Sequence, residues 1–162
     1  MIANVLFANV LFVCLGNICR SPLAEAALRR AVTARALNIG VDSAGTGDWH
    51  VGKPPDRRAM AVARRHGIDI SGYRARQISA EDFLRFTHIL ALDADNLRDL
   101  EAERPIGATA HLSLLLDYVP GRTGTGVVDP YFGEDEGFDA TWADVTMGVE
   151  GFLNALTGRA TV

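Results

Sequence analysis

Apolar runs alternate along the chain with stretches in which apolar residues recur at helical spacing. The run at 8–13 leads directly into Cys14 and is the candidate for the first strand. Ser21 and Pro22 follow as a good helix N-cap and first helical residue, and residues 23–37 continue at helical spacing. Similar patterns predict strands at 41–44, 88–92 and 110–112, a short helix opened by a capping box at 79–82, and helices at 56–66, 95–103 and 138–156.

This order of elements predicts an α/β domain with a mainly parallel sheet. The length of 162 residues suits one compact core, and no linker interrupts it, so we expect one domain over 1–162. Ligands of such sheets bind beyond the carboxyl ends of the strands, at a topological switch point. The loop at 14–20 lies there, between the first strand and the first helix.

Residues 3–7 and 8–12 are identical copies of ANVLF. The second copy leads into Cys14, so we assign it to the strand and set residues 1–7 apart as a candidate N-terminal extension. The repeat has an odd length, so a slip by one copy would exchange the two faces of the strand. The first copy is an extended start, an added segment or an extension of the strand, and the pattern leaves these alternatives open.

Charge and cysteine content narrow the classes of function. The net charge of −4 argues against a general nucleic-acid binder, which needs a basic face. No apolar run reaches the ~18 residues that span a membrane, and the start lacks the features of a signal peptide, so we expect no membrane insertion and a cytoplasmic protein. Cys14 and Cys19 are too close for a disulfide framework and too few for a zinc site, which leaves reactive cysteine chemistry.

Residues 14–21, CLGNICRS, place a C-x5-R-S sequence at the junction of strand and helix. Such a loop can curl so that its N–H groups and the helix N-terminus bind an anion, and Gly16 and Asn17 tolerate the left-handed backbone of a curl. Arg20 can hold two phosphate oxygens, and the same positive field favours a thiolate nucleophile at Cys14, to which Ser21 can donate. The plainer interpretation is a buried strand cysteine and a surface arginine, but the Gly, Asn and Ser-Pro context favours a phosphate site.

The segment FVCLGNICRSP at 12–22 resembles the signature of the low-molecular-weight protein tyrosine phosphatases. Further segments match in the same order, from about residue 10 to the last helix: VDSAGT at 41–46, VGKPPD at 51–56, ARQI at 75–78, DADNLRDL at 93–100 and DPYFG at 129–133. The resemblance implies a four-stranded parallel sheet flanked by helices, a cysteinyl-phosphate intermediate on Cys14, and no metal or cofactor.

Departure of a phenolate requires a proton donor, and Asp129 is the candidate. Pro130 restricts Asp129 to extended backbone, which would direct its carboxyl group off a loop. By itself, an Asp before Pro is more typical of a turn. The resemblance implies that Asp129 is the general acid of the first step, and Asp129 would then be the base for the water of the second.

The substrate slot is expected to be lined by aromatic residues, since a phenyl ester has to enter it. Trp49 in a glycine-rich loop and Tyr131 are the candidate walls, Leu15 and Ile18 the base, and His50 could touch substrate. We assign to substrate binding Leu15, Gly16, Asn17, Ile18, Cys19, Ser21, Trp49 and Tyr131.

The resemblance also implies supporting residues. Asn17 and Ser43 match the pair that braces the phosphate loop, and Asp93 matches a residue that supports Arg20. Tyr73 stands where the family often has His, so one partner of Asn17 would be changed. Phe132 replaces a second tyrosine, so regulation through that hydroxyl would be absent.

Three rival functions are weighed against phosphotyrosine hydrolysis. Arsenate reductases that share this fold and loop relay oxidation through further cysteines, and this chain has none after Cys19. Protein arginine phosphatases tend to have Thr at the position of Ile18. A phosphate-binding module without catalysis would need no acid, whereas this chain has Asp129.

The expected partner is a phosphotyrosine-containing protein, and in a bacterium the family suggests a tyrosine autokinase or a polysaccharide-assembly protein. Physiological substrate and oligomeric state stay open. Because Cys19 lies in the same loop as Cys14, oxidation could join the two sulfurs and make the enzyme redox-sensitive. The alternative is that Cys19 packs beneath the loop as a small apolar residue.

Overall fold

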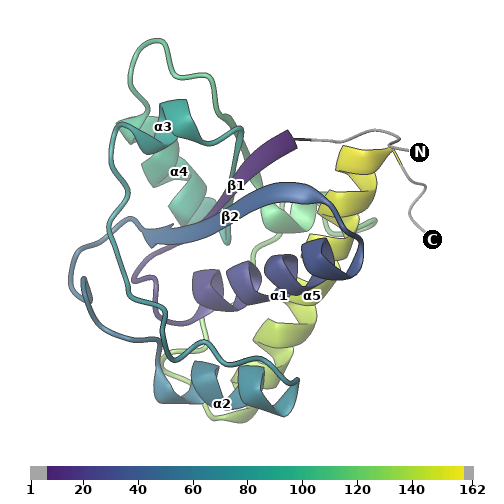
Figure 1. The fold of residues 1–162 in the computed structure, drawn as a ribbon. Coiled ribbons are helices and arrows are strands. Elements are labelled where there is room, and N and C mark those ends of the chain that lie inside the picture. The colour runs from purple at the N-terminus through teal and green to yellow at the C-terminus, as the bar shows by residue number, and fades with distance from the viewer. Residues whose placement is uncertain (1–6, 159–162) are drawn as a thin grey trace.

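The computed structural model describes residues 7–158, in which strands and helices alternate (Figure 1). All four strands are parallel, in the order β2-β1-β3-β4, which confirms the expected four-stranded α/β fold. The elements are β1 (Phe7–Cys14), α1 (Arg20–Ala34), β2 (Asn38–Gly45), α2 (Arg57–Arg65), α3 (Asp82–Arg85), β3 (His88–Ala91), α4 (Ala94–Glu103), β4 (His111–Leu114), the 3-10 turn η1 (Leu115–Tyr118) and α5 (Glu136–Thr157).

Strand β1 lies inside the sheet and divides the core into two layers. Successive side chains of a strand point to opposite faces, so Val10 and Phe12 pack with α1 and α5, whereas Leu11 and Val13 pack with α3 and α4. All four side chains are fully buried. Figure 1 shows the same division, with α1 and α5 on one side of the strands and α3 and α4 on the other.

The order of the strands brings two loops together. The chain leaves β1, passes through α1 and adds β2 on one side, and it later adds β3 on the opposite side of β1. The carboxyl ends of β1 and β3 are therefore neighbours at the point where the winding reverses. The loop after Cys14 and the turn at Asp93 meet there.

Helix α1 starts earlier than its sequence indicates. Its first residue is Arg20, and Cys19 is the N-cap without a side-chain hydrogen bond, so the prediction of Ser21 as N-cap is wrong. The hydroxyl of Ser21 instead accepts a hydrogen bond from the Asn17 amide at 2.8 Å. A side chain used to brace the loop cannot also cap the helix.

Other boundaries agree more closely. Asp56 caps α2 by accepting the N–H of Arg58 at 2.8 Å, and the helix ends before Gly67, whose φ is 82°. At α3 only half of the expected capping box forms, because the Asp82 carboxylate accepts the N–H of Ser79 at 2.8 Å without a reciprocal bond. Strand β2 extends well beyond the predicted 41–44, since it pairs with the whole of β1.

The second ANVLF copy lies within β1, which begins at Phe7, the last residue of the first copy. Residues 3–6 of the first copy lie outside the described residues. Among the described helices, none has the length and apolarity needed to cross a membrane.

Candidate active site

The loop at 15–19 connects β1 to α1 and leaves its backbone amides without protein acceptors among the described residues. Asn17 has a φ of 57°, the left-handed conformation that Asn tolerates better than most residues. Within the described chain, the backbone N–H groups of residues 15–20 donate to no other protein group. Unused amides together with the start of α1 make an anion-binding nest.

Gly16 has a role other than the expected one. It is absent from the residues with positive φ, so its backbone does not require glycine. A Cβ at this position would lie 2.9 Å from Cδ2 of His50. Gly16 therefore gives the imidazole room to pack on the loop.

The side chain of Asn17 braces the loop from behind. Its amide nitrogen donates to Ser21 Oγ at 2.8 Å and to Ser43 Oγ at 2.9 Å, and its amide oxygen accepts the Arg76 N–H at 3.0 Å. These contacts use both amide hydrogens and the oxygen. Tyr73, at the position where a histidine partner was expected, is not among them.

The hydrogen bonds around Asn17 have a defined direction. Ser43 accepts from Asn17, so it donates its own hydrogen to Glu25 Oε1 at 2.6 Å. Ser21 likewise accepts from Asn17, and its own hydrogen can reach Cys14 Sγ at 3.1 Å or the Ala44 carbonyl oxygen at 3.5 Å. The sulfur is the nearer of the two acceptors, and once Cys14 is a thiolate the Ser21 hydroxyl can donate to it and stabilise its charge.

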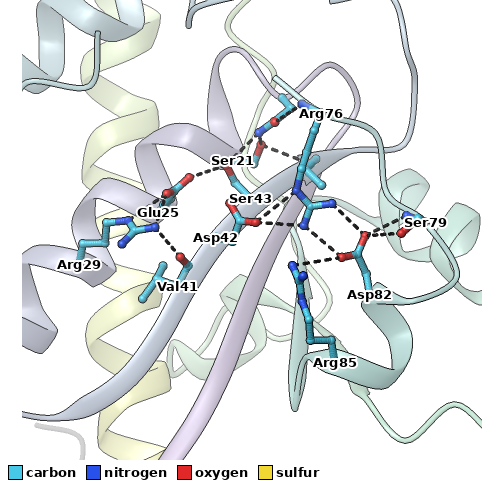
Figure 2. Close-up of polar contacts among 12 residues, drawn as sticks. Ser21, Glu25, Arg29, Val41, Asp42, Ser43, Arg76, Ser79, Asp82 and Arg85 are labelled. Atoms are coloured by element: carbon cyan, nitrogen blue, oxygen red, sulfur yellow. Dashed lines mark hydrogen bonds and ion pairs between the residues drawn. The ribbon is translucent and has the colours of Figure 1, made fainter. Parts of the chain in front are cut away.

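Glu25 and Arg76 hold the two ends of this network (Figure 2). Glu25 on α1 is buried and also accepts from Arg29 Nε at 2.9 Å. Burial raises the pKa of Glu25, although the hydrogen bonds from Ser43 and Arg29 oppose the shift. The guanidinium of Arg76 bridges Asp42 at 3.0 Å and Asp82 at 3.0 Å. These ion pairs hold Arg76 in place, so that its backbone N–H can donate to the amide oxygen of Asn17.

Arg20 is fixed from the neighbouring loop. Its Nη1 donates to Asp93 Oδ2 at 2.6 Å and to the carbonyl oxygen of Val127 at 3.0 Å. The other carboxylate oxygen of Asp93 accepts the N–H of Asn96 at 2.8 Å, so Asp93 caps α4 as well. Burial opposes the charge of Arg20, but negative charge at Cys14 and Asp93 raises its pKa above the ordinary value.

A hollow of about 160 Å³ opens above Cys14, whose side chain is buried. It contains most of the predicted site residues, whereas Asn17, Ser21, Ser43 and Asp93 lie outside its lining and support it. Leu15 is 43% exposed and so belongs to the rim instead of the expected base. The lining residues are Cys14, Leu15, Gly16, Ile18, Cys19, Arg20, Trp49, His50, Asp129, Tyr131 and Phe132.

Asp129 faces this hollow from the loop before α5. Its Oδ2 lies 3.5 Å from Arg20 Nη2, and its Oδ1 accepts the N–H of Tyr131 at 3.1 Å. The second contact is the local turn bond expected of an Asp in this setting. The turn and catalytic interpretations are therefore compatible, because each uses a different carboxylate oxygen.

Arg58 holds the Asp129 loop in place, and sequence reasoning missed it. Its Nη2 donates to the carbonyl oxygen of Tyr131 at 2.9 Å, and its Nη1 to that of Gly133 at 3.3 Å. Asp56 in turn pairs with Arg58 at 3.0 Å. An arginine in the first turn of a helix carries no pattern that would have indicated this contact.

Cys19 is a second free, buried thiol that lines the same hollow. Burial raises the pKa of Cys19, and the negative charges of Asp56 and Cys14 raise it further. Cys19 therefore stays a neutral thiol at physiological pH. Cys14, whose sulfur lies 3.1 Å from the Ser21 hydroxyl, is the better placed nucleophile.

The Asn17 network predicts an effect of Ser43→Ala. The variant removes one acceptor of Asn17 and the donor to Glu25, so we expect about 1–3 kcal/mol lower unfolding free energy in urea and a reduced kcat for an aryl phosphate. Ser113→Ala is the matched control, because Ser113 is also a strand serine. Among the described residues its hydroxyl bonds to the Tyr118 hydroxyl at 3.0 Å and to no member of the Asn17 network. An unchanged kcat in Ser43→Ala would show that the network stabilises the fold without positioning the loop.

Comparison with known proteins gives a consistent result. The family model for low molecular weight phosphotyrosine protein phosphatase matches residues 9–161. The enzyme of that name from Schizosaccharomyces pombe is 40% identical over 116 residues, which are 72% of this chain and 74% of that protein.

Two solved structures are similar over nearly their whole length. YfkJ from Bacillus subtilis has a TM-score of 0.87 and 40% identity, with 94% of this chain and 96% of that one covered. The drosophila arginine phosphatase DARP has a TM-score of 0.85 and 38% identity, with 90% and 96% covered. With a family model that spans almost all of its residues, the chain belongs to the low molecular weight phosphotyrosine protein phosphatase family.

Proposed function

We propose that this chain hydrolyses phosphotyrosine in proteins by passing the phosphoryl group to Cys14 Sγ and then to water. One observation carries the proposal: a single hollow presents the sulfur, the unused loop amides, Arg20 and the Asp129 carboxyl group. A nucleophile, an oxyanion cradle and an acid are the three components that this transfer needs.

In the first step the Cys14 thiolate attacks phosphorus. The S–P bond forms as the bond to the phenolic oxygen breaks, and Asp129 transfers its proton to that oxygen, so tyrosine leaves neutral. Negative charge spreads over the three remaining phosphoryl oxygens, which the loop N–H groups and Arg20 bind. These donors are fixed before substrate arrives, since Asp93 and Asn17 already hold Arg20 and the loop.

In the second step water attacks the cysteinyl phosphate, and the deprotonated Asp129 takes a proton from it. The S–P bond breaks, inorganic phosphate forms, and the sulfur regains its negative charge. The hydrogen bond from Ser21 to Cys14 Sγ stabilises the departing thiolate.

Aromatic side chains at the rim favour an aryl ester as the substrate. Trp49 is 67% exposed, and Tyr131 also lines the hollow, with its backbone carbonyl group held by Arg58. A phenyl ring between them would gain stacking contacts that the short side chain of phosphoserine cannot make. We expect a phosphotyrosine protein of the cytoplasm as the partner, and a tyrosine autokinase if the source is bacterial.

The role of Asp129 predicts a dependence on the leaving group. Asp129→Asn should slow hydrolysis of alkyl-substituted phenyl phosphates by about 10²–10⁴-fold, because their phenolates leave poorly without a proton. Esters of acidic nitrophenols should be affected far less. The measurement is kcat across a series of phenyl phosphates, and an equal loss for all of them would make Asp129 a structural residue.

Selectivity against phosphoarginine tests the substrate class. Ile18 lines the hollow with a branched apolar side chain, where a guanidinium would lose hydrogen bonds. Ile18→Thr should therefore raise phosphoarginine hydrolysis relative to phosphotyrosine by about tenfold, whereas Ile18→Val should not. The assay is turnover of phosphotyrosine, phosphoserine and phosphoarginine peptides, and wild-type preference for phosphoarginine would overturn the proposal.

Oxidation is proposed to join the two cysteines. Peroxide oxidises the Cys14 thiolate to a sulfenic acid, and the Cys19 thiol displaces water from it to form a disulfide. Mild peroxide should therefore inactivate the wild type reversibly, with activity restored by a thiol reductant. Cys19→Ser should keep most of its turnover but lose activity irreversibly. Full recovery of Cys19→Ser after the same treatment would leave Cys19 a packing residue.

A further inference from the structure

A second hollow of about 300 Å³ lies beside the phosphate pocket. Leu15 and Trp49 line both hollows, so the two share a wall. The rest of its lining comes from Thr46 and Gly47 after β2 and from Asp99, Ala102 and Glu103 on α4. The catalytic steps above use none of these α4 residues.

The shared wall is held firmly against the phosphate loop. A Cβ on Gly47 would lie 2.0 Å from the Trp49 ring, so the indole rests directly on the glycine. The N–H of Gly47 donates to the carbonyl oxygen of Leu15 at 2.9 Å. The second hollow is therefore fixed relative to Cys14, and a ligand in it has a defined distance from the reacting phosphate.

Asp99 and Glu103 give this hollow its charge. They lie four residues apart on α4, and neither carboxylate forms an ion pair with another described residue, whereas Asp95 of the same helix pairs with Arg98 at 2.7 Å. Like charges at this spacing repel, and Glu103 ends the helix where the dipole favours a cation. Both acids thus disfavour the helix, and a cation in the hollow would offset both costs.

The remaining walls are suited to the stem of a long cationic side chain. Leu15, Trp49 and Ala102 offer apolar surface, along which the methylene groups of Arg or Lys can lie. The Trp49 indole can also stack with a guanidinium.

Building on the proposed phosphotyrosine activity, we propose that this second hollow binds an arginine or lysine side chain close to the phosphotyrosine in the substrate protein. The phosphate pocket takes a dianion, and the second hollow takes the cation beside it. Arginine fits better than lysine, because its planar guanidinium can stack on Trp49 while it donates to Asp99 and Glu103. The chain would thereby select phosphotyrosine sites with a basic neighbour.

Phosphotyrosine peptides test this selection in the wild-type enzyme. Arginine is placed in turn at each nearby position on either side of the phosphotyrosine, with alanine elsewhere. At one position it should raise kcat/KM by about three- to tenfold, and high salt should remove most of the advantage. No advantage at any position would overturn the proposal.

Variants on α4 show whether the hollow is responsible. Asp99→Asn combined with Glu103→Gln should abolish the arginine advantage and leave kcat/KM for p-nitrophenyl phosphate unchanged. Glu101→Gln is the matched control, since Glu101 is an exposed acid of α4 outside the hollow. Glu103→Lys should shift the preference toward glutamate at the same position.

An arginine advantage that survives the double variant would contradict the proposal. If the wild type hydrolysed neither phosphotyrosine peptides nor p-nitrophenyl phosphate, the proposed function itself would be refuted. The two failures are therefore distinguished by the same set of assays.

Discussion

The side chain of Asn17 is the contact on which the active-site loop depends. Its amide joins the loop to Ser21 at the start of α1 and to two segments that are distant in sequence, Ser43 on β2 and the backbone of Arg76. With these bonds in place the left-handed turn at Asn17 is held, and with it the loop whose amides have no acceptor among the described residues. Donors fixed in this way need no reorganisation when charge develops on the phosphoryl group.

The same contacts connect the fold to the chemistry. Reversal of the winding at β1 brings Asp93 next to Arg20, and one carboxylate both caps α4 and holds the guanidinium. Glu25 is kept in a buried position by Ser43 and Arg29, so Ser43 is held toward Asn17 with no hydrogen bond from Tyr73 to that amide.

The sequence predicted the elements near the loop well, because their signals are local. The apolar run before Cys14, the Asp56 cap and the glycine after α2 each act within a few residues. The start of α1 was predicted wrongly, since the hydroxyl of Ser21 is used by a side chain in the loop. Arg58 went unnoticed because the carbonyl groups that it holds, those of Tyr131 and Gly133, lie more than seventy positions away in the chain.

In the proposed mechanism, Cys14 carries the phosphoryl group between tyrosine and water. The most direct test is mass spectrometry of enzyme quenched rapidly during turnover of a phosphotyrosine peptide. We expect a phosphate adduct on the segment that contains Cys14, its localisation to Cys14 and not Cys19, and no turnover by Cys14→Ser. Phosphate bound to Cys19, or a Cys14→Ser variant that remains active, would show that Cys14 is not the nucleophile.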